Sequence, residues 1–135
     1  MNENVLAIDP GQKKCGIAIV SKEKELILGR IVETTNLVQE IKGLIKEYQV
    51  SKMVVGQGTN SKSIIKCLST QLSHVGLFQI AEMYTTLEAR KRYFDTHPPR
   101  GLLRLLPKSL LVPPRPYDDY AAWLIAERFL SKYRP

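Results

Sequence analysis

Acidic residues at three points of this sequence stand where a protein fold could gather them. Asp9 ends one apolar run, Glu82 ends another, and Asp118 and Asp119 open an amphipathic segment. Carboxylates that are brought together repel one another, and a divalent cation relieves that repulsion. A ligand set made only of oxygen atoms suits Mg²⁺ or Mn²⁺. Two such ions about 4 Å apart can activate a water molecule and stabilise the leaving oxygen during phosphodiester hydrolysis.

Each acid also has a purely structural interpretation. Asp9 lies in Asp9-Pro10-Gly11, and all three residue types are favoured in turns, so an ordinary hairpin explains this stretch too. Asp118 and Asp119 could simply favour the positive end of a helix, with one of them as its N-cap. The residue types alone leave both interpretations open.

The apolar pattern around these acids predicts an α/β fold. Near-continuous apolar runs indicate buried strands, and an apolar repeat of 3.6 residues indicates helices. The expected strands cover residues 5–9, 15–20, 26–32, 52–56 and 77–82. The expected helices cover residues 37–48, a stretch capped at 59–61 that ends at Gly76, a short basic stretch, and residues 117–133. Asn36 is the expected N-cap of the first helix, and Thr85 with Glu88 forms a capping box for the basic one.

This order of elements brings the acids toward one another. The first three strands form a meander, and the strand–helix–strand succession after them requires parallel crossovers. Asp9 and Glu82 therefore end at the same edge of the sheet, the edge where open α/β sheets bind ligands. In the last helix, Asp118 and Asp119 lie on the two flanks of the apolar stripe, so either one could face the sheet. The stripe consists of Ala122, Ile125, Ala126, Phe129 and Leu130.

The chain resembles two nuclease families in the stretch Asp9-Pro10-Gly11-x-Lys13-Lys14-x-Gly16-Ile17-Ala18. It looks like the first strand pair of RuvC-like Holliday-junction resolvases and of YqgF-type nucleases of pre-16S rRNA. Both have the ribonuclease H-like fold. The resemblance therefore implies a mixed five-stranded sheet, with a three-strand antiparallel meander, two parallel strands and helices on both faces. In that fold the aspartate of the first strand is a metal ligand, which carries over to Asp9.

Two further segments extend the resemblance to nearly the whole chain. The segment Ala81-Glu82-Met83-Tyr84-Thr85-Thr86 is similar to the YqgF-type segment with an acid before Thr-Thr, which implies that Glu82 is the second acid. The segment Asp118-Asp119-Tyr120-Ala121-Ala122 resembles the closing helix, and alignment on Ala-Ala makes Asp118 the third acid, with Asp119 as the alternative. The family's usual Asp-Glu-Arg is Ala81-Glu82-Met83 here, which removes a cation that would contact substrate. Its Gly-x-Pro after the fourth strand is Gly56-Gln57-Gly58.

The charge of the chain favours an anionic partner. The formal net charge is +7, and seven basic residues against two acidic ones fall between Met83 and Pro116. A charge run is often only a solvated surface. This one directly follows Glu82, so we expect it to hold a phosphate backbone beside the acids. The candidate nucleic-acid-binding residues are Lys13, Lys14, Arg90, Lys91, Arg92, Arg100 and Arg104.

Size and composition set the remaining expectations. Residues 1–135, of which 44% are hydrophobic, are expected to form one domain. No apolar run approaches the roughly 20 residues that span a bilayer, and no signal-peptide pattern opens the chain, so we expect a cytoplasmic protein without membrane contact. Cys15 and Cys67 show no zinc-type spacing and are both expected to be buried free thiols. Six of the eight prolines interrupt residues 95–116, whose leucines could cover the core, a groove or a partner.

A metal-dependent nuclease is the first functional hypothesis. RNA is the favoured substrate because the YqgF resemblance implies processing of precursor 16S rRNA, and Holliday-junction DNA is the alternative. Either a monomer or a homodimer is expected, and only a twofold dimer suits a junction resolvase, which cuts two strands symmetrically. A nucleic-acid-binding module without catalysis is the alternative of another class. A phosphotransferase is disfavoured because the chain has no second domain to close over a nucleotide and no P-loop sequence.

Overall fold

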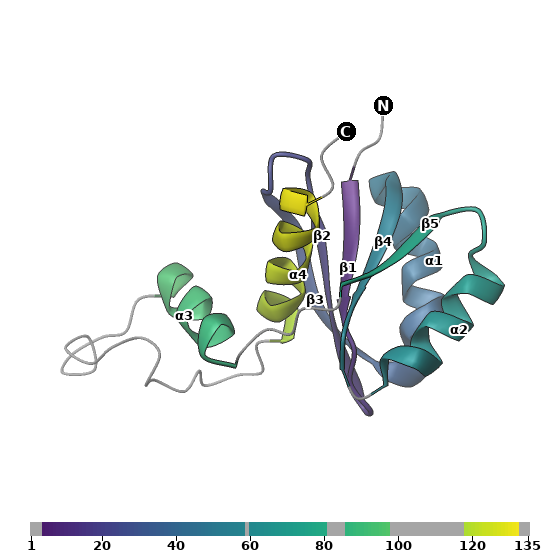
Figure 1. The fold of residues 1–135 in the computed structure, drawn as a ribbon, viewed down its shortest axis with the longest axis horizontal. Coiled ribbons are helices and arrows are strands. Elements are labelled where there is room, and N and C mark those ends of the chain that lie inside the picture. The colour runs from purple at the N-terminus through teal and green to yellow at the C-terminus, as the bar shows by residue number, and fades with distance from the viewer. Residues whose placement is uncertain (1–3, 59, 81–85, 98–117, 133–135) are drawn as a thin grey trace.

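The computed structural model shows a five-stranded sheet with helices against both of its faces (Figure 1). It describes residues 4–58, 60–80, 86–97 and 118–132, and among these the side chains of residues 86–90, 118 and 132 are left out. The strands are β1 (Asn4–Asp9), β2 (Lys14–Val20), β3 (Leu26–Glu33), β4 (Val50–Gly56) and β5 (Gly76–Ile80). The helices are α1 (Leu37–Tyr48), α2 (Ser61–Gln71), α3 (Thr86–Thr96) and α4 (Asp118–Lys132).

The sheet has the strand order β3-β2-β1-β4-β5. β1 to β3 form an antiparallel meander, and β4 and β5 extend it in parallel on the other side of β1. This is the mixed sheet that the sequence predicts. Because β1, β4 and β5 run in the same direction, their carboxyl ends meet at one edge, and the register places Ile8 of β1 beside Val55 of β4.

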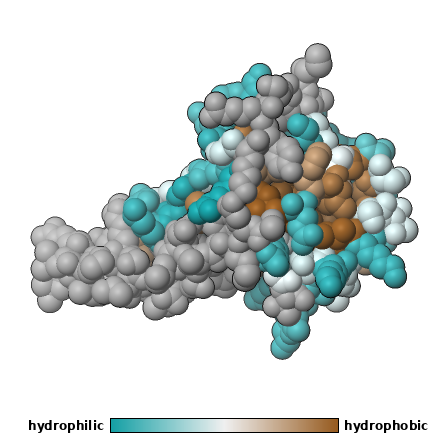
Figure 2. Space-filling view, viewed as in Figure 1, coloured by the Kyte–Doolittle hydropathy of each residue, from teal (hydrophilic) through white to brown (hydrophobic). Residues whose placement is uncertain are grey.

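Each face of the sheet has its own apolar core. Side chains alternate along a strand, so Leu6 and Ile8 of β1 face one layer while Val5 and Ala7 face the other. The first layer consists of α1 and α2, and the second is α4 with its expected apolar stripe. Burial on both faces explains why the central strands are apolar at nearly every position. Figure 2 shows apolar side chains at the surface over β4 and β5, beside α4.

Several local predictions were wrong. The second helix ends at Gln71 rather than at Gly76, which is the first residue of β5. Asn36 is the N-cap residue of α1, as the sequence predicts, but its side chain makes no capping hydrogen bond. A short 3₁₀ helix, Thr34–Asn36, leads directly into α1. Cys67 is exposed on α2, whereas Cys15 is buried as expected.

Part of the sequence prediction lies outside the described residues. This applies to Glu82, to Thr85 and to residues 98–116 of the proline-rich stretch, whereas Asp95 and Thr96 complete α3. Among the residues that are described, no helix combines the length and the apolar character needed to cross a membrane.

Candidate functional site

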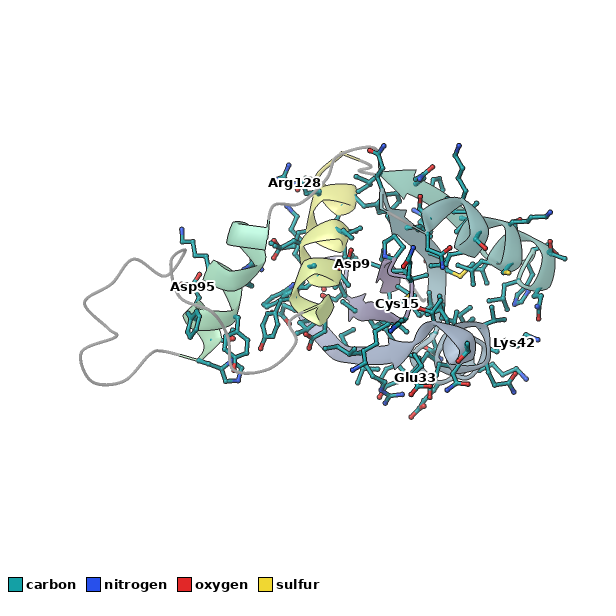
Figure 3. All side chains as sticks on the ribbon, turned by 90° about the horizontal axis from the view of Figure 1, so that it is seen from below. Asp9, Cys15, Glu33, Lys42, Asp95 and Arg128 are labelled. Atoms are coloured by element: carbon teal, nitrogen blue, oxygen red, sulfur yellow. The ribbon has the colours of Figure 1, made fainter. Side chains whose placement is uncertain are left out.

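Asp9 is the last residue of β1 and lies half-buried at the carboxyl edge of the sheet. It stands opposite Gly16 of β2. Alternation along β1 gives Asp9 the same face as Val5 and Ala7, which is the face that α4 covers. Figure 3 shows Asp9 next to α4. A carboxylate at this position can present oxygen atoms to a ligand at the edge of the sheet.

One backbone atom in the turn after Asp9 is hydrogen-bonded to two other parts of the chain. The carbonyl oxygen of Gly11 accepts hydrogen bonds from the Thr34 hydroxyl at 3.0 Å and from the Asn60 amide nitrogen at 3.4 Å. The Cys15 thiol also donates to it, at 3.8 Å, and lies 3.3 Å from the Thr34 oxygen. The backbone N–H of Thr34 donates to the Lys13 carbonyl oxygen at 2.8 Å. These bonds hold the segment that follows Asp9 in one conformation.

Glycines allow the close packing of this turn. A Cβ on Gly11 would collide with the carbonyl oxygen of Lys14, and a Cβ on Gly58 would stand 3.0 Å from Cγ of Pro10. The sequence indicated a turn at Asp9-Pro10-Gly11. It did not single out Thr34 or Asn60, because their contacts with Gly11 span 23 and 49 residues and no motif links them. Only the capping pattern near Asn60 pointed to that part of the site.

The carboxylate of Asp119 lies against β3. One of its oxygens accepts a hydrogen bond from the backbone N–H of Tyr120 at 3.1 Å. The other lies 3.2 Å from the position that a Cβ on Gly29 would take. Gly29 belongs to β3, which is two strands away from β1 and Asp9. The side chain of Asp118 is not described, so its role as the partner of Asp9 stays a prediction.

The gathering of three acids stays a prediction. Glu82 lies outside the described residues, and so does the side chain of Asp118. Within the described part of the chain, no group of three or more His, Cys, Asp or Glu side chains could hold a metal ion. What the structure does provide is the arrangement around them: β1 and β5 end at one edge, and α4 begins against the same face as Asp9.

The predicted basic residues fall into different environments. Lys13 and Lys14 are exposed shortly after Asp9, and Lys91 is exposed on α3. Arg92 instead donates two hydrogen bonds to Glu127 of α4, at 2.8 and 2.9 Å, and its guanidinium lies 4.5 Å from the ring centre of Trp123. The side chain of Arg90 and the residues Arg100 and Arg104 are not described.

Comparison with known proteins assigns the chain to a family. Residues 3–132 match the sequence model of the RuvX family, which is described as Holliday junction resolvase. The chain belongs to the RuvX family. The resemblance that the motifs around Asp9, Glu82 and Asp118 indicated is thereby confirmed at the level of the family. No curated protein matches this RuvX-family chain.

A solved structure of RuvC agrees with this assignment at the level of the fold. RuvC from T. thermophilus, solved in complex with a Holliday junction substrate, is similar over 97% of this chain and 96% of its own, with a TM-score of 0.59 and 16% sequence identity. Pelota from Archaeoglobus fulgidus is similar over 68% of this chain and 32% of its own, with a TM-score of 0.48 and 8% identity. The RuvC likeness fits the predicted ribonuclease H-like fold. Together, the RuvX family and this fold support a nuclease function of the junction-resolvase type.

Proposed function

We propose that this RuvX-family protein is a metal-dependent phosphodiester hydrolase of nucleic acid, with Asp9, Glu82 and Asp118 as its catalytic acids. The observation that supports this most is the placement of Asp9. Its carboxylate is half-buried at the carboxyl edge of a central strand, and the following turn is held through Gly11 by Thr34 and Asn60. These hydrogen bonds from two distant segments fix the backbone next to the carboxylate.

The donor set fits Mg²⁺ or Mn²⁺ as the cofactor. Asp9 offers carboxylate oxygens on the face of the sheet where α4 begins with Asp118, and oxygen ligands are those that these cations prefer. Asp119 is the alternative ligand. When bound, a two-metal centre supplies charge stabilisation to both oxygens of an in-line displacement at phosphorus. The chain's own contribution is to hold Asp9 rigidly and to present Lys13 and Lys14 to water beside it, where they attract the phosphate backbone.

Precursor 16S rRNA is the first substrate that we propose, on the basis of the YqgF resemblance. The second is Holliday-junction DNA, which the description of the RuvX family favours. The two substrates make different demands on the assembly. A resolvase needs a twofold dimer in order to cut two strands symmetrically, whereas an RNA-processing nuclease can act as a monomer. The oligomeric state therefore bears directly on the choice.

A cleavage assay tests the proposal. Wild-type protein, Asp9→Asn and Asp95→Asn are incubated with labelled single-stranded RNA, a precursor-like rRNA and a four-way DNA junction, with Mn²⁺ or with EDTA. We expect metal-dependent cleavage by the wild type, its loss in Asp9→Asn and its retention in Asp95→Asn, which removes an exposed carboxylate on α3. Cleavage of the junction alone, by a dimer, would select the resolvase. Binding without any cleavage would select the non-catalytic module.

A further inference from the structure

A groove of about 500 Å³, lined mainly by residues with polar side chains, opens at the carboxyl ends of β4 and β5, beside the first turn of α2. Its size lies in the range of small-ligand sites, roughly 300–1,000 Å³. The side chains that line it are amides, hydroxyls and one ammonium group, with no carboxylate among them. The amides include those of Gln57 and Gln79, a hydroxyl comes from Ser61, and the ammonium group is that of Lys62. Such a lining suits an anion that also carries neutral oxygen atoms.

Ser61 gives this groove a feature that ordinary surface depressions lack. It is only 6% exposed and is the one buried polar side chain in the described part of the molecule. Its hydroxyl makes no hydrogen bond within that part, and no fully enclosed polar atom there lacks a partner, so the hydroxyl must open onto the groove. Because Ser61 lines the groove, its hydroxyl is free to hydrogen-bond to a ligand there. In the first turn of α2 the Ser61 N–H donates to the Gly58 carbonyl oxygen at 3.3 Å, which leaves the N–H groups of Lys62 and Ser63 to favour an anion at the same place.

The groove adjoins the turn that follows Asp9. Asn60 lines the groove and also donates to the Gly11 carbonyl oxygen, and Gly58 lines the groove while packing against Pro10. The two sites lie on opposite sides of the same edge of the sheet. Gln79 alternates with Phe78 and Ile80, which face α4, so it lies on the α2 side, whereas Asp9 lies on the α4 side. A ligand that reaches both must be extended, like a polymer strand that crosses the edge.

We propose that this groove binds the sugar–phosphate backbone of the nucleic acid strand that continues from the Asp9 site. Lys62 and the first turn of α2 hold one phosphate, while Ser61, Gln57 and Gln79 hydrogen-bond to sugar oxygens. One cation among neutral polar groups matches one phosphate charge per nucleotide. The inference rests on the proposed function for the identity of the ligand as nucleic acid, but it concerns strand binding and not the chemical step.

Binding is measured in EDTA, so that cleavage plays no part, by fluorescence anisotropy of short labelled single-stranded RNA and DNA over a series of salt concentrations. The variants are Lys62→Ala, Ser61→Ala with Gln79→Ala, and Lys42→Ala as the matched control, since Lys42 is an exposed lysine on α1 outside the groove (Figure 3). Thermal unfolding verifies that each variant folds. Lys62→Ala should lower the slope of log affinity against log salt by about 0.7, the value for one phosphate on a single strand. The Ser61–Gln79 variant should bind about two- to tenfold more weakly with an unchanged slope, since it loses neutral hydrogen bonds.

Three outcomes decide the inference. The inference holds if Lys62→Ala lowers the salt slope and Lys42→Ala does not, and if Ser61→Ala combined with Gln79→Ala weakens binding. Equal effects of Lys62→Ala and Lys42→Ala would overturn it, because the groove would then act only through net charge. Unchanged binding by a folded variant with both Ser61→Ala and Gln79→Ala would also overturn the inference. Failure of the proposed nuclease looks different: the wild type would cleave nothing while Lys62-dependent binding remained.

Discussion

The carbonyl oxygen of Gly11 accepts a hydrogen bond from the Thr34 hydroxyl at 3.0 Å, across 23 residues of sequence. Gly11 lies two residues after Asp9, and Thr34 directly follows β3. The bond therefore ties the turn after the first strand to the exit of the third, on the far side of β2. Asn60 reaches the same oxygen from the start of α2. The position of Asp9 thus depends on three segments that lie apart in the sequence but converge on one backbone atom.

Removing the Thr34 hydroxyl should disturb this convergence. Thr34→Val keeps the shape of the side chain and loses the donor to Gly11, which should lower the free energy of unfolding by about 1 kcal/mol. Cleavage should fall because Asp9 is no longer held rigidly, with kcat affected more than KM. Thr34→Ser retains the hydroxyl and should behave like the wild type. Urea unfolding and steady-state cleavage measure the two effects, and equal behaviour of the Val and Ser variants would contradict the role of this bond.

Two glycine substitutions should act in opposite directions. Gly11→Ala places a Cβ against the Lys14 carbonyl oxygen, so the backbone of the turn must move, which should destabilise the fold by about 1–3 kcal/mol and abolish cleavage. Gly43 lies inside α1 with nothing within 4 Å of the position of its Cβ, and Gly43→Ala should stabilise the fold by about 0.5–1 kcal/mol. Chemical denaturation of both variants gives the comparison. If Gly43→Ala destabilises the fold, helix propensity does not determine the effect of this substitution on stability.

Much of this architecture could be predicted from the sequence because its signals are local or periodic. The apolar runs indicated all five strands, and the family resemblance supplied the mixed sheet, whereas the role of Asp9 stays a prediction. The boundary between α2 and β5 was wrong because Leu72 and Val75 fit a helical repeat and Gly76 suits a helix end, while pairing of Gly76 with Lys52 of β4 places Gly76 in the strand. The exposed Cys67 and the buried Ser61 reverse the usual preferences of their residue types. The exposure of such positions depends on how α2 lies against the rest of the fold, which leaves no pattern within a single segment.

The contact of Arg92 with Glu127 and Trp123 should fasten α3 to α4. Both charged side chains are about a quarter exposed, and the bidentate geometry makes this pair stronger than an ordinary surface pair, at about 1 kcal/mol. Trp123 is the one tryptophan of the chain, so its fluorescence reports this contact directly. Arg92→Lys keeps the charge but loses the guanidinium group that makes two parallel hydrogen bonds. It should therefore shift the emission of Trp123 to longer wavelength and raise its quenching by iodide.

A second ion pair provides the control for this experiment. Arg30 and Glu40 also pair at 2.9 Å, but they lie on β3 and α1 and are more exposed. Arg30→Lys should leave the emission of Trp123 unchanged. A shift of the same size in both variants would mean that the fluorescence reports general loosening and not the docking of α3.

The two cysteines should differ in reactivity. Cys67 is exposed on α2 and Cys15 is buried beside Thr34, and both are free thiols. A thiol reagent such as DTNB should therefore modify one cysteine per folded chain quickly and the second only in denaturant, since access limits the reaction. The Cys67→Ser variant should lose the fast phase entirely. A fast phase that survives in Cys67→Ser would mean that the turn around Gly11 opens readily, contrary to the fastening by Thr34 and Asn60.

Divalent metal should stabilise the folded protein through Asp9. If the acids gather as proposed, Mn²⁺ binds the native state and not the unfolded chain, and a concentration about 100 times the dissociation constant adds about 2.7 kcal/mol. The melting temperature should rise with Mn²⁺ in the wild type and in Asp95→Asn, and stay constant in Asp9→Asn. Without metal, Asp9→Asn should melt at or above the temperature of the wild type, because one repelling charge is removed. Equal metal responses in the wild type and in Asp9→Asn would place the binding elsewhere and leave Asp9 as a residue of the turn alone.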